Sequence, residues 1–488
     1  MNTQIDVAIV GAGPVGLLLA IELKLGGADV LVLERLAALD RGIKAPSIGP
    51  VGAEALQRRG MGPALTEAEA RSFAAMGQAG AEMRARLLRS RGHFALLPLR
   101  SNAEPERRMY WVDQPAIEAV LIERASALGI EIRRGCEVTD LEQRDTGVTV
   151  GWAAVAGPDR LTCSWLAGCD GGRSTVRKLA GFGFSGAPPS LTMYQAILDL
   201  DHPERLPRGV SRLPGGVVIN GPRPRRLGLH DFSGPPADRE APVTRDGIEG
   251  ALRRISGADV RVTAIEEANR WSDVTRLADT YRRDRVLVAG DAAHVHSPLG
   301  GQGLSLGLAD AANLGWKLAA VIRGDKSAGF LDSYTAERRP VAEAVLANTL
   351  AQVALMRTDD RSNALREVFA TLMQLDDVND RVDGMMSGLA MRYDLDSDRA
   401  EVGSLAADRP LGAGTSLYSQ MADGAGILLD ATSDGRVAAL AARTARLRCL
   451  AVDAPRSLLI RPDGCIAWSA DGDETDGLAD ALERWFSR

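Results

Sequence analysis

The sequence predicts an α/β fold of the Rossmann-like type, in which glycine-rich loops follow buried strands. Three observations predict it. Residues 5–34 (IDVAIVGAGPVGLLLAIELKLGGADVLVLE) read as strand, glycine turn, helix and strand. Two later strand-like runs also end in glycine and aspartate, in "LAGCDGGRS" and "VLVAGDAAH". Alone, the second loop is only a turn that leads into a helix, but together with the opening stretch it favours this fold.

Length and composition describe a soluble globular chain of more than one domain. The chain has 488 residues, and 45% of them are hydrophobic and 25% charged. A net charge of -6 argues against nucleic acid as a partner. No apolar run approaches the roughly 18 residues that span a bilayer, so no membrane insertion is expected.

The cysteines and the first residues of the sequence indicate where in the cell the protein is expected. The five cysteines show no CxxC spacing, which is typical of reduced thiols. The stretch "MNTQIDVAIVGAG" has no basic segment like that of a signal peptide. We therefore expect a cytoplasmic protein, either a monomer or a homodimer.

The first loop predicts a dinucleotide site. Gly11, Gly13 and Gly16 form GxGxxG, which allows a tight turn, close approach of a pyrophosphate and close helix packing. The helix predicted over Val15–Leu25 offers free N–H groups to the phosphates. Glu34 ends the second strand, where an acid accepts hydrogen bonds from a ribose, and Arg35 follows it. The alternative is a helix-capping turn without ligand, and the motif does not separate FAD from a nicotinamide cofactor.

The third loop, "GDAAHVHSPLGGQGLSLG", suggests which cofactor is bound. Asp291 ends a strand next to Gly290, where it can hold a ribityl or ribose hydroxyl. The glycines near position 301 lead into a helix with apolar residues on roughly one face (Leu304, Leu308, Ala312 and Leu318). Backbone N–H groups at that helix start can stabilise negative charge on a flat ring such as a reduced flavin.

The sequence disfavours two other chemistries for this loop, a metal site and a serine nucleophile. His294 and His296 have no cysteine or third histidine nearby, so we expect structural hydrogen bonds and no metal. Ser297 and Ser305 lack the GxSxG context of a serine nucleophile.

The three motifs together resemble the class A flavoprotein aromatic hydroxylases of the para-hydroxybenzoate hydroxylase type. "GAGPVG", "CDGGRSTVR" and "GDAAHVHSPLGGQGLSLGLADAANLGWKLA" match that family's dinucleotide, DG and GD motifs in order. "VTRLADTYRRDRVLVAGDAAH" and the terminal "LLIRPDGCIAW" look like the bacterial aromatic polyketide hydroxylases, and the resemblance covers essentially the whole chain.

The resemblance implies a set of site residues. The loop at Pro298, Gly300 and Gly301 would lie against the flavin ring where the reaction occurs, with no side-chain base assigned. The residues implied to bind FAD are Gly11, Gly13, Pro14, Gly16, Glu34, Arg35, Lys44, Gln114, Asp170, Gly290, Asp291, Pro298, Gly300, Gly301, Gln302, Gly303 and Leu304. In the family Asp170 serves both FAD and nicotinamide binding, partly indirectly.

The chain departs from the family pattern at four positions. Lys44 stands where an arginine usually meets the pyrophosphate, and a lysine neutralises a phosphate without the bidentate fork. Val51 replaces a second arginine, and Ser305 and Ala309 replace a common asparagine and glutamine.

The resemblance also implies the domain organisation. A discontinuous FAD-binding domain of the para-hydroxybenzoate hydroxylase-like fold is expected over 1–175 and 275–390, and a β-sheet substrate domain over 176–274. A thioredoxin-like α/β domain is expected over 395–488. That domain has no CxxC, so a structural role is favoured over disulfide exchange.

The implied function is an FAD-dependent monooxygenase that consumes NADPH or NADH and O2 and hydroxylates a phenolic or polycyclic aromatic substrate through a flavin C4a-hydroperoxide. Alternatives are a Baeyer–Villiger or antibiotic-inactivating monooxygenase on the same scaffold and, more remotely, a flavin- or ligand-binding protein without turnover. The sequence names no base that would deprotonate a phenol. His93, Arg212, His230 and Trp271 are candidates for the substrate pocket.

Overall fold

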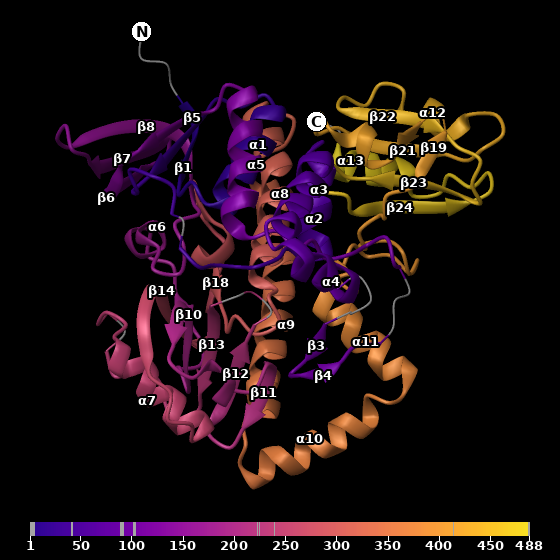
Figure 1. Ribbon diagram of the computed structural model, residues 1–488. Helices are drawn as coiled ribbons and strands as arrows, with labels where there is room; N and C mark the ends of the chain where they lie inside the picture. Colours follow the sequence, from indigo (N-terminus) through magenta and orange to yellow (C-terminus); the bar gives the residue numbers. More distant parts are fainter. Residues whose placement is uncertain are drawn as a thin grey trace.

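The computed structural model describes residues 5–40, 42–87, 92–100, 104–221, 223, 225–238, 240–412 and 414–486. Three larger sheets organise the chain, and the long helices α8 (Gly303–Ile322) and α9 (Asp332–Met356) run between them (Figure 1). None of the described helices is both long and apolar enough to cross a membrane.

The largest sheet has eight strands, with β16-β17-β8-β1-β2-β5 as its main order and the β6–β7 hairpin attached to β8. β17, β8, β1, β2 and β5 are parallel to one another, and the first four carry the near-continuous apolar runs of strands buried on both faces. The bounds are β1 Ile5–Val10, β2 Val30–Glu34, β5 Glu131–Arg134, β6 Glu137–Arg144, β7 Gly147–Ala153, β8 Asp159–Gly168, β16 Arg282–Arg283 and β17 Val286–Val288. Helix α1 (Pro14–Leu25) packs beside this sheet and contacts both α5 (Gln114–Ala127) and α8 (Figure 1).

Helix α8 differs from the prediction of a single apolar face. Nearly every residue from Ser305 to Ala320 is buried, including Asp310, Asn313 and Lys317. The helix itself is as predicted, but its burial extends beyond the predicted face because α1, α2 (Pro50–Gln57) and α9 all pack around α8. A helix that is covered on all sides cannot be recognised by an apolar stripe alone.

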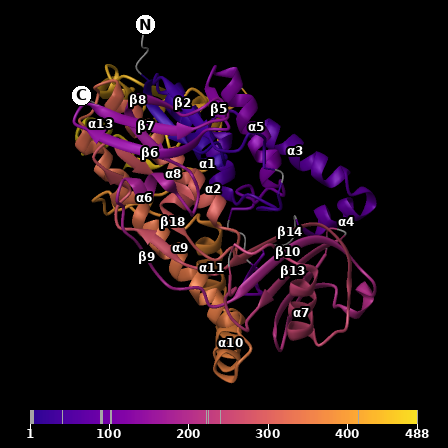
Figure 2. The same ribbon diagram turned by 90° about the vertical axis from the view of Figure 1, so that its left-hand side faces the viewer.

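The second sheet has five antiparallel strands in the order β11-β12-β13-β10-β14. Their bounds are β10 Thr192–Leu200, β11 Gly209–Leu213, β12 Gly216–Asn220, β13 Arg226–Asp231 and β14 Val262–Ser272. Helix α7 (Arg245–Ser256) covers one face with its apolar side, on which Ile248, Leu252 and Ile255 are buried (Figure 2). The other face, the inner face from here on, looks toward α9.

The third sheet is formed by the C-terminal part of the chain in the order β22-β21-β23-β24. Its strands are β21 Gly426–Asp430, β22 Leu447–Ala451, β23 Arg456–Ile460 and β24 Ile466–Asp471. β21 and β22 are parallel and the β23–β24 hairpin is antiparallel, with helices α12 (Arg436–Ala441) and α13 (Leu478–Trp485) alongside. Leu478, Leu482 and Trp485 form the buried side of α13.

The remaining elements connect these layers. The helices are α3 Gly62–Ala74, α4 Gly77–Leu87, α6 Thr175–Leu179, α10 Asp360–Leu372 and α11 Asp376–Ser387, with short 3-10 turns at Pro203–Arg205, Gly290–Ala292, Ala328–Leu331 and Tyr418–Met421. The short strands are β3 His93–Phe94, β4 Leu97–Pro98, β9 Phe184–Ser185, β15 Arg276–Ala278, β18 His294–Val295, β19 Pro410–Gly412 and β20 Thr415–Ser416.

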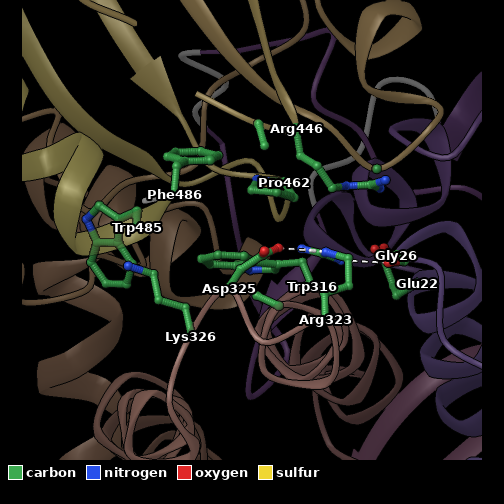
Figure 3. Close-up of a pocket in the computed structure, with 13 residues that line it drawn as sticks. Glu22, Gly26, Trp316, Arg323, Asp325, Lys326, Arg446, Pro462, Trp485 and Phe486 are labelled. Atoms are coloured by element: carbon green, nitrogen blue, oxygen red, sulfur yellow. Dashed lines mark hydrogen bonds and ion pairs between the residues drawn. The ribbon is translucent and has the colours of Figure 1, made fainter. Parts of the chain in front are cut away.

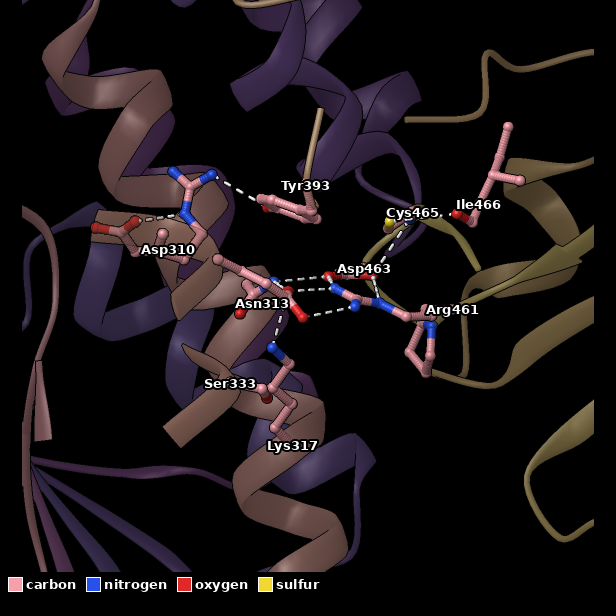
Figure 4. Close-up of polar contacts among 12 residues, drawn as sticks. Asp310, Asn313, Lys317, Ser333, Tyr393, Arg461, Asp463, Cys465 and Ile466 are labelled. Carbon is pink, nitrogen blue, oxygen red and sulfur yellow. Dashed lines mark hydrogen bonds and ion pairs between the residues drawn. The ribbon is translucent and has the colours of Figure 1, made fainter. Parts of the chain in front are cut away.

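A buried charge network joins the C-terminal sheet to α8 and α9 (Figure 4). The completely buried Arg461 guanidinium donates to Glu337 at 2.9 and 2.7 Å and to Asp463 at 3.1 and 2.5 Å. Asn313 donates to both carboxylates, at 2.7 and 3.0 Å, and Lys317 pairs with Glu337 at 2.9 Å. Burial alone would raise the pKa of Glu337, but the charges of Arg461 and Lys317 outweigh it and hold that pKa below its ordinary value. Each buried charge in this network therefore has an opposite charge in contact.

A cavity of ≈ 30 Å³ lies near the network, between the end of α1 and the C-terminal part (Figure 3). Glu22 and Trp316 line it, and Glu22 Oε1 and Trp316 Nε1 are buried atoms without a partner among the described residues. A space of this size holds about one or two waters. We expect water there to satisfy the two atoms.

Candidate active site

The glycines of the first loop have the geometry that a dinucleotide site requires. A Cβ on Gly16 would lie 2.0 Å from the Gly11 carbonyl oxygen, so only glycine lets α1 pack this close to the loop. Gly11 has a φ of +105°, and a Cβ there would lie 2.4 Å from the carbonyl oxygen of Cys169. Around Gly13 nothing lies within 4 Å of the added Cβ. The space for a pyrophosphate is therefore at Gly13, in front of the helix that Pro14 begins.

Glu34 lies at the end of β2 with its carboxylate turned back to this loop. One oxygen accepts from the Ala12 N–H at 2.7 Å and the other from the Leu36 N–H at 2.9 Å. These bonds fix the carboxylate beside the glycines and leave lone pairs for ribose hydroxyls. Arg35 is exposed next to it.

Lys44 and Gln114 are 70 residues apart in sequence and meet at one carboxylate. Gln114 donates to Glu118 at 2.8 Å, and the Lys44 ammonium lies 3.9 Å from Glu118 and 3.0 Å from Asp40. Burial raises the pKa of Glu118, and Gln114 and Lys44 partly offset this. Lys44 therefore lies at the start of α5 as a half-exposed positive charge.

Val51 and Ala309, two of the positions that differ from the family pattern, lie in the same part of the structure. Both side chains are buried in the same apolar cluster, between α2 and α8. Ser305 accepts a hydrogen bond from the Gly49 N–H at 3.0 Å. In this chain the segment before α2 is thus held to α8 by packing and by one hydroxyl.

Asp170 is already engaged by the protein. Its carboxylate accepts from the Ser174 hydroxyl at 2.5 Å and from the Thr175 and Val176 N–H groups at 2.6 and 3.1 Å. It therefore caps the start of α6 and fixes the loop after β8. In this geometry Asp170 shapes the site through the backbone of that loop.

Gly290 and Asp291 follow β17, next to β8 in the sheet. Asp291 is exposed and makes no hydrogen bond within the described chain. Gly290 has a φ of +61°, and its N–H donates to Asp310 at 3.1 Å. The free carboxylate is thus presented at the same edge of the sheet as Gly11 and Glu34.

The two histidines of this loop are held by the protein. The completely buried His294 donates through Nε2 to Asp310 at 2.6 Å, and His296 donates through Nδ1 to the Ser297 carbonyl at 2.8 Å. Burial alone would raise the pKa of Asp310, but the charges of Arg338 and His294 outweigh it and hold that pKa below its ordinary value. Among the described residues no group of three or more His, Cys, Asp or Glu side chains is placed to hold a metal ion.

The loop at 298–303 leads directly into α8. Gly300 and Gly301 have φ values of +80° and +63°, and nothing lies within 4 Å of a Cβ added to Gly301. Gln302 begins α8 without capping it through its side chain, so the N–H groups of Gly303 and Leu304 at the helix start are not capped. An exposed glycine backbone with uncapped N–H groups fits a flat ring that carries negative charge.

Gln302 was predicted from the sequence, but the α9 side chains that hold it were not. Gln302 donates to the Met385 carbonyl at 2.8 Å and accepts from Asn348 at 2.9 Å. Asn348 in turn accepts from Gln352 at 3.2 Å. Asn348 and Gln352 are four residues apart on α9, and two amides on an otherwise apolar helix face were the signal that could have found them.

Beyond the loop lies an apolar cluster. Leu299 packs in one cluster with Met193 and Val217 of the inner face, Phe94 of the β3–β4 hairpin and Val353 of α9. The four pocket candidates fall in two places. His230, Arg212 and Trp271 lie on the inner face, and His93 lies on the hairpin.

Comparison with known proteins agrees with this geometry. Residues 4–349 match the FAD binding domain family and residues 399–488 the aromatic-ring hydroxylase C-terminal family. The chain is 40% identical over 514 residues to the 12-dehydrotetracycline 5-monooxygenase/anhydrotetracycline 6-monooxygenase of Streptomyces rimosus, covering 99% of this chain and 98% of that protein. It is 36% identical to the rifampicin monooxygenase of Streptomyces venezuelae, again over 99% and 98% of the two chains.

A solved structure gives the same result. The anhydrotetracycline hydroxylase OxyS from Streptomyces rimosus superimposes with a TM-score of 0.87 at 38% identity, over 100% of both chains. The chain therefore belongs to the FAD-binding aromatic-ring hydroxylases and is an FAD-dependent monooxygenase.

Proposed function

We propose that this monooxygenase hydroxylates a polycyclic phenol of the polyketide type, with NADPH or NADH and O2 as co-substrates. One observation carries the proposal: the glycine loop contacts the apolar inner face of the five-stranded sheet through Leu299. A flat aromatic substrate would bind at this apolar contact between the loop and the sheet. The similarity to the anhydrotetracycline monooxygenase supports this substrate class.

Bound FAD would supply the electron transfer and the activation of oxygen. The chain's own residues would bind the cofactor and stabilise charge on its ring. The space at Gly13 and the start of α1 would take the pyrophosphate, Glu34 the ribose, and Asp291 the ribityl chain. Lys44 and Gln114 would lie on the flavin side of the phosphates. The N–H groups at the start of α8 would stabilise negative charge on the ring.

The apolar cluster around Leu299 has two tasks in this proposal. Its buried side chains would exclude water, which protects a reactive oxygen species from decay. They would also hold the aromatic ring so that one carbon faces the flavin. A second candidate is oxidation of a macrocyclic antibiotic, which the similarity to the rifampicin monooxygenase favours.

We also propose the domain division given by the sequence, with a thioredoxin-like C-terminal domain. The order β22-β21-β23-β24, with one parallel pair and a closing hairpin, supports this assignment. Cys449 and Cys465 are not bonded to each other, and burial raises the pKa of both thiols. A role in disulfide exchange is therefore disfavoured.

The test is turnover by the purified holoenzyme. NADPH and NADH oxidation, O2 uptake and product mass are followed with anhydrotetracycline, 1,8-dihydroxyanthraquinone and rifampicin. A product heavier by one oxygen atom from either of the first two supports the proposal. Oxygenation of rifampicin alone would favour the second candidate, and reduced cofactor consumed only to hydrogen peroxide with all three would contradict both.

One variant tests the cofactor assignment. Asp291→Ala removes the free carboxylate and is expected to weaken FAD binding by roughly 10- to 150-fold, since a charge-assisted hydrogen bond contributes about 1.5–3 kcal/mol. Asp145→Ala, at an exposed aspartate beyond β6, is the control and should keep wild-type flavin occupancy. Equal occupancy in the two variants would refute the role of Asp291.

A further inference from the structure

The strand register places five side chains in one row across the inner face. Direct cross-strand partners in antiparallel strands share a face, and the pairs run from Arg212 to Val217, His230, Met193 and Trp271. Leu229, the neighbour of His230 in the chain, points to the opposite face and is buried against α7. His230 is thus the central polar side chain of this row.

The surroundings of the row are apolar. Met193 and Val217, the two direct neighbours of His230, belong to the cluster that contains Leu299 of the glycine loop. Ala95 of the β3–β4 turn and Met356 at the end of α9 belong to the same cluster. His230 therefore lies on the surface that the proposed substrate would contact.

The charged groups near this surface already have partners. Arg212 donates to two backbone carbonyls at the end of α9 and to Asn363. Arg366 donates to two backbone carbonyls, at 2.5 and 3.2 Å. His93 accepts from the Leu96 N–H at 3.3 Å. These groups hold the protein's own backbone.

His230 has no such partner. Its Nδ1 is buried without a hydrogen bond in the described part of the chain, its Nε2 makes no hydrogen bond there either, and the residue as a whole is only partly buried. Burial, and then the charge of His93, lowers the pKa of His230 to about 4. The ring is therefore neutral near pH 7, with one nitrogen that donates and one that accepts. An unpartnered polar ring in apolar surroundings destabilises the fold, which points to a ligand that would complete it.

We propose that His230 binds an oxygen substituent of the aromatic substrate, a phenolic hydroxyl, and so determines which carbon of the substrate faces the flavin. The rings of the substrate would lie on Met193, Val217 and Leu299. This inference rests on the proposed function. It adds His230 as the residue that forms a hydrogen bond with the phenolic hydroxyl of the substrate.

The experiment compares a phenol with its methyl ether. The holoenzyme, wild type or His230→Leu, is titrated with 1,8-dihydroxyanthraquinone and with 1,8-dimethoxyanthraquinone, and binding is followed by quenching of flavin fluorescence. His230→Leu is expected to raise the Kd of the phenol roughly 3- to 10-fold, the size of one net hydrogen bond. The Kd of the ether should stay within about twofold. His230→Gln keeps a polar group and should recover part of the phenol binding.

Thermal stability separates a binding role from a packing role. Leucine removes an unpartnered polar ring from apolar surroundings, so the Tm of His230→Leu should equal or exceed that of the wild type. His202→Leu is the matched control, because His202 is an exposed histidine near the end of β10 that contacts Glu204 at 3.0 Å. It should change neither Kd.

The possible contrary results distinguish a failure of the role of His230 from a failure of the proposed function. A phenol Kd unchanged in His230→Leu, or an equal loss for phenol and ether, would overturn the role of His230. A lower Tm would also overturn it, since His230 would then be a packing residue. Failure of the wild type both to bind the phenol and to oxygenate any compound of the turnover panel would overturn the proposed function itself.

Discussion

The charge network between the C-terminal sheet and α8 allows a quantitative prediction. Arg461→Met keeps the volume of the side chain and removes the charge that lies between two carboxylates. Glu337 and Asp463 would then face only Lys317 and Asn313 in a fully buried setting. Removing one partner of a buried ion pair costs about 3–5 kcal/mol, because the remaining charge is left uncompensated.

The size of the Tm change depends on how the chain unfolds. At about 2.1 cal/mol/K of unfolding entropy per residue, this cost lowers Tm by about 3–5 °C if all 488 residues unfold together. If the C-terminal part of about 90 residues unfolds separately, the same cost lowers its own transition by about 15–25 °C. The prediction is the smaller shift in a single transition, because the network makes the two parts one cooperative unit.

Differential scanning calorimetry of the holoenzyme measures this shift. Arg456→Met is the matched control, since Arg456 begins β23, the strand that ends just before Arg461, and its side chain is 47% exposed and pairs with Glu401 and Asp471 at the surface. Surface pairs contribute at most about 1 kcal/mol, so the control should move Tm by at most about 1 °C. Equal small shifts in both variants would refute the reasoning, and two separate transitions would refute the cooperative unit.

Three further predictions follow from the network and the first loop. The pKa values of Glu337 and Asp463 are lowered in the folded state, so their stabilisation is present above pH 4 and is lost as the pH falls through the folded-state values. The Tm difference between wild type and Arg461→Met should thus shrink below about pH 4, and a constant difference from pH 7 to 3 would contradict this. Gly16→Ala places a Cβ 2.0 Å from a carbonyl oxygen and should lower Tm of the flavin-free protein by several degrees, which a thermal melt would show. Gly13→Ala has no neighbour within 4 Å and should keep that Tm while the Kd for FAD rises roughly tenfold or more; wild-type FAD affinity would refute the pyrophosphate position.

The parts of the site that could be predicted are those with local geometry. Gly11, Gly13 and Gly16 are separated by two and three residues, and one turn between strand and helix explains all three. The position of Asp291 followed from the end of one strand. The structure brings these loops together, because β1, β8 and β17 are parallel and their carboxyl ends meet at one edge of the sheet.

The parts that could not be predicted depend on partners that are distant in sequence. Asp463 reads as an ordinary hairpin-turn residue, yet its partners include Asn313, 150 residues earlier in the chain. Asp310 and Lys317 read as the polar side of an amphipathic helix and are instead completely buried in α8. A buried charge has no local signature, because only its partner makes burial tolerable.

The pairing of β8 with β17 has a consequence for synthesis of the chain. The two strands are adjacent in the large sheet, but all five strands of the second sheet lie between them in sequence. At a translation rate of about 5–20 residues per second, β17 leaves the ribosome roughly 6–24 s after β8. During that interval the part of β8 that pairs with β17 (Leu166–Gly168) has no partner on that side, because β7 covers only Asp159–Cys163, while the five-stranded insert can complete its own antiparallel pairing. The second sheet is therefore expected to fold before the flavin-binding sheet closes, and the nascent chain passes through a stage in which a chaperone can bind the open edge of β8.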